Sequence, residues 1–359
     1  MALLTLNVGS SSIKFAVFDE AKGITSPLNA GQVEGLGAGG ATHEQAMQEV
    51  LGVLGRVGAA PIQAVGHRIV HGGIEFDGPA LIDAAVLARI SALQPLAPLH
   101  QPHNLAGVRA AQRAWPGVPQ VACFDTAFHR SMPDINQRFA VPEALFVAGV
   151  RRYGFHGLSY ESICAQLRVI NPAAAVGRIV IAHLGNGASM CAVHRGRAVA
   201  TTMSFSPLDG LPMGTRCGRI DAAVVLHLLR EGRSPEQVST LLHHESGLLG
   251  LSGVSADMRT LLASNAPSAR MAIDYFVEHL LRELAGMVAA LRGIDLLVFT
   301  GGIGENADTL RSRVVQGAAW MGLRLDADAN ANVRVMRTNE EAVIAAHTAH
   351  ITIDGKRAC

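Results

Sequence analysis

Two arginines, an aspartate and a histidine have unusual neighbours in this sequence. Arg68 stands in "VGHRIVHGG" and Arg216 in "PMGTRCGRID", each among glycines and apolar residues. A guanidinium group in such a setting suits planar, bidentate recognition of a carboxylate or a phosphate. Asp125 in "CFDTAFH" lies beside phenylalanine and needs a partner, either a metal-bound water or an arginine. His156 in "RRYGFHGLSY" is either a functional group or a satisfied core residue, at roughly even odds.

Three glycine-rich turns are candidates for binding phosphate. The first, in "LNVGSSSIKF" at residues 6–15, offers backbone amides, serine hydroxyls and Lys14, which together suit an anion. Taken alone, this segment is more often an ordinary serine-rich turn. A second turn at residues 185–187 and a third in "FTGGIGENAD" favour the functional interpretation, because α/β proteins hold nucleotides where a strand runs into glycines and a helix.

The elements that must position these residues alternate between strands and helices. Residues 178–185 and 295–302 are short, apolar and end in glycine, as strands do, whereas residues 222–232 and 269–293 have the three-and-four spacing of helices. This mixture predicts an α/β architecture. A strand–turn–strand pattern at the start recurs at residues 179–196. It indicates either two unrelated hairpins or a duplication, with two similar domains that each present a glycine turn to one shared cleft.

Composition excludes several classes of protein. The chain has 359 residues, 49% of them hydrophobic, and a formal net charge of +1, so it is globular, long enough for two domains, and has no electrostatic case for binding nucleic acid or a membrane. No apolar run reaches the length of a membrane span, and the polar residues after position 6 interrupt any signal peptide. Five scattered cysteines indicate neither a disulfide framework nor a zinc site. We expect a cytoplasmic protein.

Two common nucleotide-binding motifs do not account for the glycines. Gly35, Gly37 and Gly40 match G-x-G-x-x-G, but no acidic residue follows at the distance that a dinucleotide-binding fold requires. A Walker A sequence is also missing, which argues against a P-loop enzyme.

Ten stretches taken together closely resemble the acetate and propionate kinase family. They follow the family's order, run from residue 7 to residue 341, and read "NVGSSSIKF", "GHRIVHGG", "LAPLHQPHN", "FDTAFH", "YGFHGLSY", "AHLGNGAS", "PLDGLPMGTRCG", "SGVSADMR", "FTGGIGEN" and "TNEE". The resemblance implies a duplicated, RNase H-like α/β fold of the actin and Hsp70 type, with the nucleotide in a cleft between two domains. Residues 1–127 plus 340–359 would form the first domain, and residues 128–339 the second.

The activity implied by this resemblance is the reversible transfer of the γ-phosphoryl group of ATP to acetate. Two alternatives remain open. A propionate kinase would use the same machinery with a wider pocket. A nucleotide-gated binding module of the Hsp70 or actin type would hydrolyse ATP without an acceptor, but it would have no need for two buried arginines and a small apolar pocket. The family also implies a homodimer formed through the second domain.

Roles for individual residues follow from the same resemblance. Asp125, His156 and Arg216 would be catalytic, and Arg68, Val70, Leu99 and Pro207 would bind the acid. Asn7 and Glu340 would hold Mg²⁺, or Mn²⁺ in its place. The nucleotide would be bound by Ser10, Ser12, Lys14, His183, Leu184, Gly185, Asn186, Gly187, Asp257, Met258, Arg259, Gly302, Ile303, Gly304, Glu305 and Asn306.

Some features depart from the family or have a simpler explanation. The chain is shorter than typical members, with most of the shortening expected between the first hairpin and "GHRIVHGG". Arg219 adds a positive charge three residues from Arg216, which could alter the affinity for phosphate. Glu340 and Glu341 stand where a helix is expected to begin, and acidic residues are favourable there in any protein.

Overall fold

The chain forms two compact units in a computed structural model that describes residues 1–9, 12–35, 41–56, 61–324 and 332–357. Unit 1 comprises Met1–Arg130, Gly157–Ser162 and Asn339–Cys359, and unit 2 comprises Ser131–His156 and Ile163–Thr338. These units are defined by packing alone. The domain limits expected from the sequence, at residues 127/128 and 339/340, therefore stay a prediction.

Unit 1 is built on a six-stranded sheet in the order β3-β2-β1-β4-β6-β5. The first three strands are antiparallel neighbours, β4 and β6 run parallel to β1, and β5 runs antiparallel to β6 at the edge. Parallel strands bring their carboxyl ends to one edge of the sheet, which is where ligands bind in such folds. The strands are β1 (Ala2–Val8), β2 (Ser12–Asp19), β3 (Asn29–Glu34), β4 (Ala64–Ile69), β5 (Ala80–Leu81) and β6 (Gln120–Phe124).

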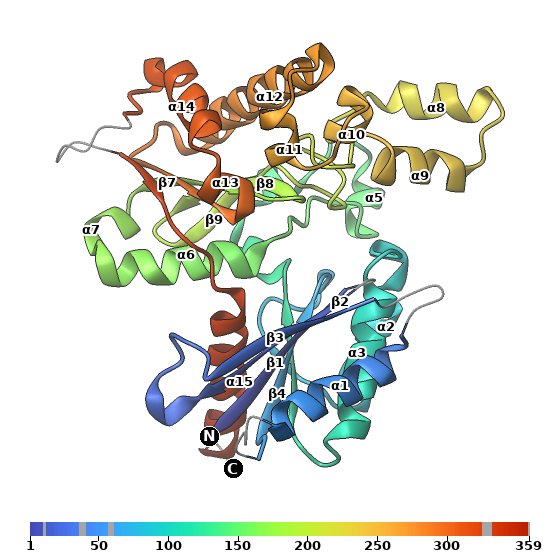
Figure 1. Ribbon diagram of the computed structural model, residues 1–359, viewed down its shortest axis with the longest axis vertical. Helices are drawn as coiled ribbons and strands as arrows, with labels where there is room; N and C mark the ends of the chain where they lie inside the picture. Colours follow the sequence, from blue (N-terminus) through green and yellow to red (C-terminus); the bar gives the residue numbers. More distant parts are fainter. Residues whose placement is uncertain (10–11, 36–40, 57–60, 325–331, 358–359) are drawn as a thin grey trace. The chain divides into compact units, whose positions relative to one another are not determined.

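Helices cover both faces of this sheet because side chains of alternate strand residues point to opposite faces. Leu4 and Leu6 of β1 pack in one core with α1 (His43–Arg56) and α3 (Gln101–Ala114). Leu3 packs on the opposite face in a second core with α15 (Glu340–Arg357). Figure 1 shows α1 and α3 on one side of the sheet and α15 on the other. The unit also contains α2 (Ala84–Ala92) and the short 3₁₀ turns η1 (Glu20–Lys22) and η2 (Gln94–Leu96), while η3 (Ala127–Ser131) leads out of it.

Unit 2 repeats the topology of unit 1. Its five strands lie in the order β11-β10-β7-β8-β9, with β7, β8 and β9 antiparallel and β10 and β11 parallel to β7. This is the order and direction of β6-β4-β1-β2-β3 in unit 1. The duplication predicted from the recurring strand–turn–strand pattern is therefore confirmed. The strands are β7 (Arg178–Leu184), β8 (Ala188–His194), β9 (Arg197–Thr201), β10 (Leu296–Thr300) and β11 (Val333–Val335).

The helices of unit 2 are more numerous, and α12 packs across β7, β8 and β9. The helices predicted at residues 222–232 and 269–293 are present as α8 and α12. None of the helices that the structure describes is long and apolar enough to cross a membrane. The elements are α4 (Asp134–Gln137), α5 (Glu143–Val147), α6 (Gly157–Ile170, which starts in unit 1), α7 (Pro172–Ala175), α8 (Ala222–Arg230), α9 (Pro235–His244), α10 (Gly247–Ser252), α11 (Met258–Ala263), α12 (Pro267–Leu291), α13 (Gly301–Asn306), α14 (Asp308–Gly317) and η4 (Ala319–Met321).

One predicted loop is helical. The sequence predicts a glycine loop after the strand at residues 295–300, but α13 begins directly at Gly301. Gly301 has φ +79°, and a Cβ there would lie 2.8 Å from the carbonyl oxygen of Leu184. The glycine is needed because only a residue without a side chain tolerates both this conformation and this close approach to β7.

The packing of α15 on the first sheet makes a stability prediction. A Cβ on Gly66 of β4 would lie 2.2 Å from the Oγ1 atom of Thr348 and 2.6 Å from the Cγ2 atom of Ile344. Gly66→Ala should therefore overpack this interface and lower the free energy of unfolding by about 1–3 kcal/mol. Gly286→Ala is the matched control, because Gly286 is an exposed residue inside α12 with open space around its Cβ position. That variant should gain about 1 kcal/mol from helix propensity. Urea denaturation of both variants checks the prediction, and equal effects would contradict it.

Candidate functional site

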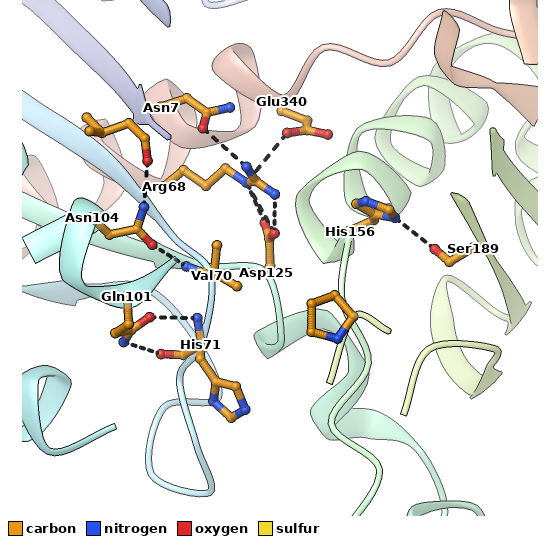
Figure 2. A network of polar contacts seen from close by, with 12 residues as sticks. Asn7, Arg68, Val70, His71, Gln101, Asn104, Asp125, His156, Ser189 and Glu340 are labelled. Carbon is orange, nitrogen blue, oxygen red and sulfur yellow. Dashed lines mark hydrogen bonds and ion pairs between the residues drawn. The ribbon is translucent and has the colours of Figure 1, made fainter. Parts of the chain in front are cut away.

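Unit 1 contains a cluster of polar side chains centred on the guanidinium group of Arg68. Its Nε donates to both carboxylate oxygens of Asp125, at 3.0 and 3.1 Å, and its Nη2 donates to Oδ2 of the same carboxylate at 2.5 Å. Nη1 donates to Oδ1 of Asn7 at 3.2 Å, and Glu340 forms an ion pair with Nε at 3.9 Å. Figure 2 shows the four side chains converging on one point. The sequence prediction that Asp125 needs an arginine or a metal-bound water is answered by Arg68.

The fold explains why these four residues meet. Asn7 is near the carboxyl end of β1, Arg68 is near the carboxyl end of β4, and Asp125 directly follows β6. The three strands are parallel neighbours, so their ends lie at one edge of the sheet. Glu340 is the first residue of α15, which packs against β1, β4 and β6. The predicted helix start at Glu340 is therefore confirmed.

The electrostatics of this cluster are those of a crowded, buried site. Asp125 is 1% exposed, and a buried carboxylate of this kind is stable only when it is paired and hydrogen-bonded. Burial would lower the pKa of Arg68, but the charges of Asp125 and Glu340 keep it above its ordinary value. Burial raises the pKa of Glu340 to about 7; the charge of Arg68 opposes this rise, and Asp125 and Glu341 add to it. Burial and two neighbouring carboxylates thus outweigh the positive charges of Arg68 and Lys14 at Glu340.

The first glycine turn lies next to this cluster. Lys14 pairs with Asn7 across the β1–β2 hairpin, and its positive charge acts on Glu340. Ser12 begins β2 and is half-buried. Ser10 lies outside the described residues. The structure thus brings Lys14 close to the two residues expected to hold a metal ion.

Two of the three residues expected around the methyl group of the acid are also in unit 1. Val70 directly follows β4 and is 7% exposed, whereas Leu99 lies in the turn before α3 and is 38% exposed. Pro207 belongs to unit 2, where its carbonyl oxygen accepts a hydrogen bond from Nη1 of Arg216 at 3.0 Å.

Unit 2 contains a second cluster, around the β7–β8 turn. A Cβ on Gly187 would lie 3.3 Å from Nε2 of His156 and 3.7 Å from Nη1 of Arg216, so both side chains closely approach this glycine. His156 stacks on His183 with ring centroids 4.3 Å apart, and its Nδ1 lies 2.8 Å from the hydroxyl of Ser189. Figure 2 shows the contact between His156 and Ser189.

The backbone of His156 supports a functional interpretation. Its φ of 57° is left-handed, a conformation that costs a residue with a side chain about 1–3 kcal/mol. Such strain persists only where the surroundings enforce it, and it is concentrated at functional sites.

A pocket of about 740 Å³ in unit 2 is bordered by residues from three of the predicted motifs. Ala256, Leu262 and Ala307 were missed by sequence analysis. Ala256 and Ala307 adjoin the motifs, and Leu262 is one helical turn after Met258, so helical spacing was the available signal. The lining residues are Gly185, Asn186, Ala256, Asp257, Met258, Arg259, Leu262, Gly302, Ile303, Asn306 and Ala307.

Other residues of the predicted nucleotide set are not among those lining this pocket. Leu184 and Gly304 are buried and pack β7 against α13, and Glu305 accepts a hydrogen bond from the backbone amide of Gly301 at 3.0 Å. Their described contacts stabilise the start of α13. His183 and Gly187 belong to the cluster around His156.

Arg219, which departs from the family's pattern, forms an ion pair in the structure. Its Nη2 lies 3.0 Å from Oε1 of Glu283, a residue of α12 whose side chain is 7% exposed. The added positive charge is therefore balanced locally. Its effect on the affinity for phosphate stays a prediction.

The residues of the Arg68 cluster fit a magnesium ion. Asn7 and Glu340 supply amide and carboxylate oxygens, the ligands that Mg²⁺ prefers. Burial is the main cause of the raised pKa of Glu340, and a nearby cation would favour its ionised form. No group of three or more histidine, cysteine or acidic side chains able to hold a metal occurs among the described residues.

Known proteins resemble this chain over nearly its whole length. A model of the acetokinase family matches residues 2–354. The acetate kinase of Methylocella silvestris is 47% identical over 96% of this chain and 96% of that protein. The acetate kinase of Rhodopseudomonas palustris is 49% identical over 92% of this chain and 89% of its own length.

Solved structures agree. The acetate kinase of Porphyromonas gingivalis has a TM-score of 0.88 and 35% identity, covering 98% of this chain and 99% of that one. A propionate kinase from Francisella tularensis has a TM-score of 0.91 and 34% identity, covering 97% and 99%. A ROK hexokinase from Thermus thermophilus, at 14% identity and a TM-score of 0.50, shares the fold alone. The family model and the relatives together show that this chain belongs to the acetokinase family.

Proposed function

We propose that this protein is an acetate kinase, which transfers the γ-phosphoryl group of ATP reversibly to acetate and yields acetyl phosphate and ADP. Relatives named acetate kinase, at 41–49% identity over 92–98% of the chain, support the choice of reaction. The geometric observation that carries it is the meeting of His156 and Arg216 beside Gly187. A phosphoryl group bound near these two side chains would meet two nitrogen groups able to stabilise its charge.

The chemistry needs little proton transfer. Acetate is ionised at neutral pH, so its oxygen can attack the γ-phosphorus directly. As the new P–O bond forms, the bond to the bridging oxygen breaks, and the electron pair leaves with ADP. The main barrier is repulsion between two anions, which positioning and positive charge overcome. Arg68, Lys14, His156 and Arg216 would supply that charge.

Asp125 would act as a positioning residue for Arg68. Three hydrogen bonds from two N–H donors hold one side of the guanidinium group against this carboxylate, and Asn7 accepts from a third donor. A guanidinium group has five N–H donors, and one on Nη1 and one on Nη2 remain outside these bonds among the described residues. Those two donors would bind the carboxylate of acetate. Val70, two residues further along, would contact the methyl group.

A bound Mg²⁺ would be held by Asn7 and Glu340, with Mn²⁺ able to take its place, and would neutralise charge on the phosphates of the nucleotide. The pocket between Asp257–Arg259 and α13 would hold the nucleoside of ATP or ADP. Its volume of about 740 Å³ lies within the usual range for small-molecule sites.

A propionate kinase is the second candidate, favoured by the likeness to the propionate kinase from Francisella tularensis. The choice between the acids depends on the space beside Val70. A nucleotide-gated binding module has no such support, because the relatives that cover the chain are named as kinases.

Assembly and location are part of the proposal. Helix α8 is apolar over most of its length, none of its residues is buried, and Leu226 is 50% exposed. An apolar helix left uncovered in the single chain suits an interface with a second copy. We therefore expect a homodimer formed through unit 2, in the cytoplasm, where ATP is available.

Activity assays with two acids test the proposed function. With Mg²⁺ and ATP in excess, ADP formation should depend on acetate, and kcat/KM for acetate should exceed that for propionate by roughly 10–200-fold, the value of one methylene group in an apolar pocket. Val70→Ala should shift this ratio towards propionate, mainly through a lower KM for the longer acid. Hydrolysis independent of any acid would favour the binding module. A wild-type preference for propionate would favour the second candidate.

Substitution of Arg216 tests its contact with the transferring group. Arg216→Lys keeps the charge but loses the planar fork, so kcat should fall by about 10²–10³-fold while the affinity for ATP changes little. Arg219→Lys is the matched control, because Arg219 is 62% exposed and paired with Glu283. It should retain nearly all activity. Normal turnover of Arg216→Lys would show that Arg216 does not act on the phosphoryl group.

The magnesium assignment predicts a change in metal dependence. Asn7→Ala and Glu340→Ala should each raise the Mg²⁺ concentration that gives half the maximal rate, since each removes an oxygen ligand. Glu236→Ala serves as the control, because Glu236 is also an acidic residue in the first turn of a helix, α9. Its removal should leave the metal dependence as in the wild type. If all three variants keep that dependence, Glu340 merely stabilises the start of its helix.

A further inference from the structure

The strands that carry Arg68 and Asn7 separate before the site. The ladder between β1 and β4 ends at the pair Leu6 and His67, although both strands continue towards the site. Beyond this point β1 remains paired only with β2, and β4 only with β6. Main-chain groups that face the widening gap lose their ladder partners, and buried groups of this kind must find others.

Asn104 of α3 fills this gap with both ends of its amide group. Its Nδ2 donates to the carbonyl oxygen of Val8 at 2.7 Å, and its Oδ1 accepts from the backbone amide of Val70 at 3.0 Å. Asn104 is 4% exposed, and the two residues that it joins are buried as well. Figure 2 shows the amide of Asn104 with these two hydrogen bonds. One side chain therefore bridges the end of β1 and the residue after β4.

Two other residues on the same face of α3 support this bridge. Gln101, one turn earlier, is fully buried; it donates to the carbonyl oxygen of His71 at 3.0 Å and accepts from its amide at 3.3 Å. Gly107, one turn later, allows close approach, because a Cβ there would lie 2.6 Å from a methyl carbon of Val8. Residues at a spacing of three share a helix face, so α3 is fixed against both strand ends over two turns.

We propose that Asn104 is a positioning residue that fixes the distance between the ends of β1 and β4. The end of β1 carries Asn7 and leads into the glycine turn expected to bind phosphate, and the end of β4 carries Arg68 and leads into Val70. This inference rests on the proposed function, since it assigns the acid to Val70 and the phosphates to the turn after β1. A shift of about 1 Å between reacting groups can reduce a rate by about 100-fold. The competing explanation is that Asn104 only satisfies the buried backbone groups of Val8 and Val70 and has no effect on catalysis.

Asn104→Asp distinguishes these explanations, because it changes one atom and makes the bridge depend on pH. In its neutral form the introduced carboxyl group donates to Val8 and accepts from Val70, as the amide does. In its ionised form it cannot donate, and it repels the Val8 carbonyl. Burial raises the pKa of such a group above the ordinary value of about 3.9, so both forms can be reached between pH 5.5 and pH 8.5.

Other titratable groups pack against α3 or lie on it, and they are common to variant and wild type. Burial lowers the pKa of His71 to about 4, and burial together with His103 lowers the pKa of His43, which stacks on that residue. Arg68 stays charged throughout. Glu340, whose pKa burial raises to about 7, titrates within this range in both proteins. Dividing the activity of the variant by that of the wild type at each pH therefore removes the contributions that the two proteins share.

We expect Asn104→Asp to have reduced activity at high pH and to regain activity as the pH falls. At pH 8.5, kcat/KM of Asn104→Asp for acetate should be roughly 10–100-fold below the wild type, with a raised KM for acetate and a lower acetate-to-propionate ratio. The deficit should shrink steadily towards pH 5.5. Asn171→Asp is the control, because Asn171 only accepts a hydrogen bond at the start of α7, which an aspartate also does. Its activity relative to the wild type should not vary with pH.

The outcomes separate the two proposals. If the wild type lacks acetate-dependent ADP formation, the proposed function fails and this inference fails with it. If the wild type is active, a constant deficit or none at all in folded Asn104→Asp, as judged by circular dichroism at each pH, overturns the positioning role alone. If that variant is unfolded throughout, Asn104→Ser takes its place, since it removes the bridge and adds no charge. A raised KM for acetate then supports the inference, and an unchanged KM contradicts it.

Discussion

The ion pair between Arg68 and Asp125 is the contact on which the site in unit 1 depends. A carboxylate that is 1% exposed cannot remain ionised without a partner, and the guanidinium group supplies one through three hydrogen bonds. Removing either residue would leave a buried charge behind. The strength of this pair also fixes the orientation of Arg68, so that its remaining N–H donors have one direction in which to bind an acid. Arg68 therefore stabilises the buried carboxylate of Asp125 and is also the side chain proposed to bind the acid.

Duplication of one five-stranded sheet gives the protein two similar edges with different chemistry. In unit 1 the edge carries carboxylates, an amide, an arginine and a lysine, which suit a metal ion and a small acid. In unit 2 the corresponding turn, between β7 and β8, is bordered by His156 and Arg216, which suit a phosphoryl group. The two units therefore share one backbone topology and differ in the side chains at the ends of their strands. Phosphoryl transfer to an anion depends on positive charge that offsets the repulsion between two negative reactants.

Much of this arrangement could be predicted from the sequence. The hairpins, the helices at residues 222–232 and 269–293, the need of Asp125 for an arginine or a metal-bound water, and the helix start at Glu340 all follow from local pattern or from a buried charge that must be paired. Other contacts could not be predicted in this way. The bonds of Asn104 and Gln101 join a helix to the main chain of residues 34 and 30 positions away, and nothing in local spacing specifies them. The ion pair between Arg219 and Glu283 spans 64 positions and is equally invisible to periodicity. Such contacts depend on how α3 and α12 are placed by tertiary packing.

The cluster around Arg68 contains more acidic than basic side chains. Asp125, Glu340 and Glu341 bring three carboxylates to the neighbourhood of Arg68 and Lys14, which carry two positive charges. Burial is the main cause of the raised pKa of Glu340, and the charges of Asp125 and Glu341 add to it. An edge with net negative charge would repel both acetate and ATP, so these residues alone make a poor site for anions. A bound divalent cation would make the net charge of this edge positive. It would also interact with Glu340 in place of Arg68. The carboxylates that would oppose the reaction are thus the groups proposed to bind the ion, and a dependence of the proposed reaction on Mg²⁺ would follow from these side chains.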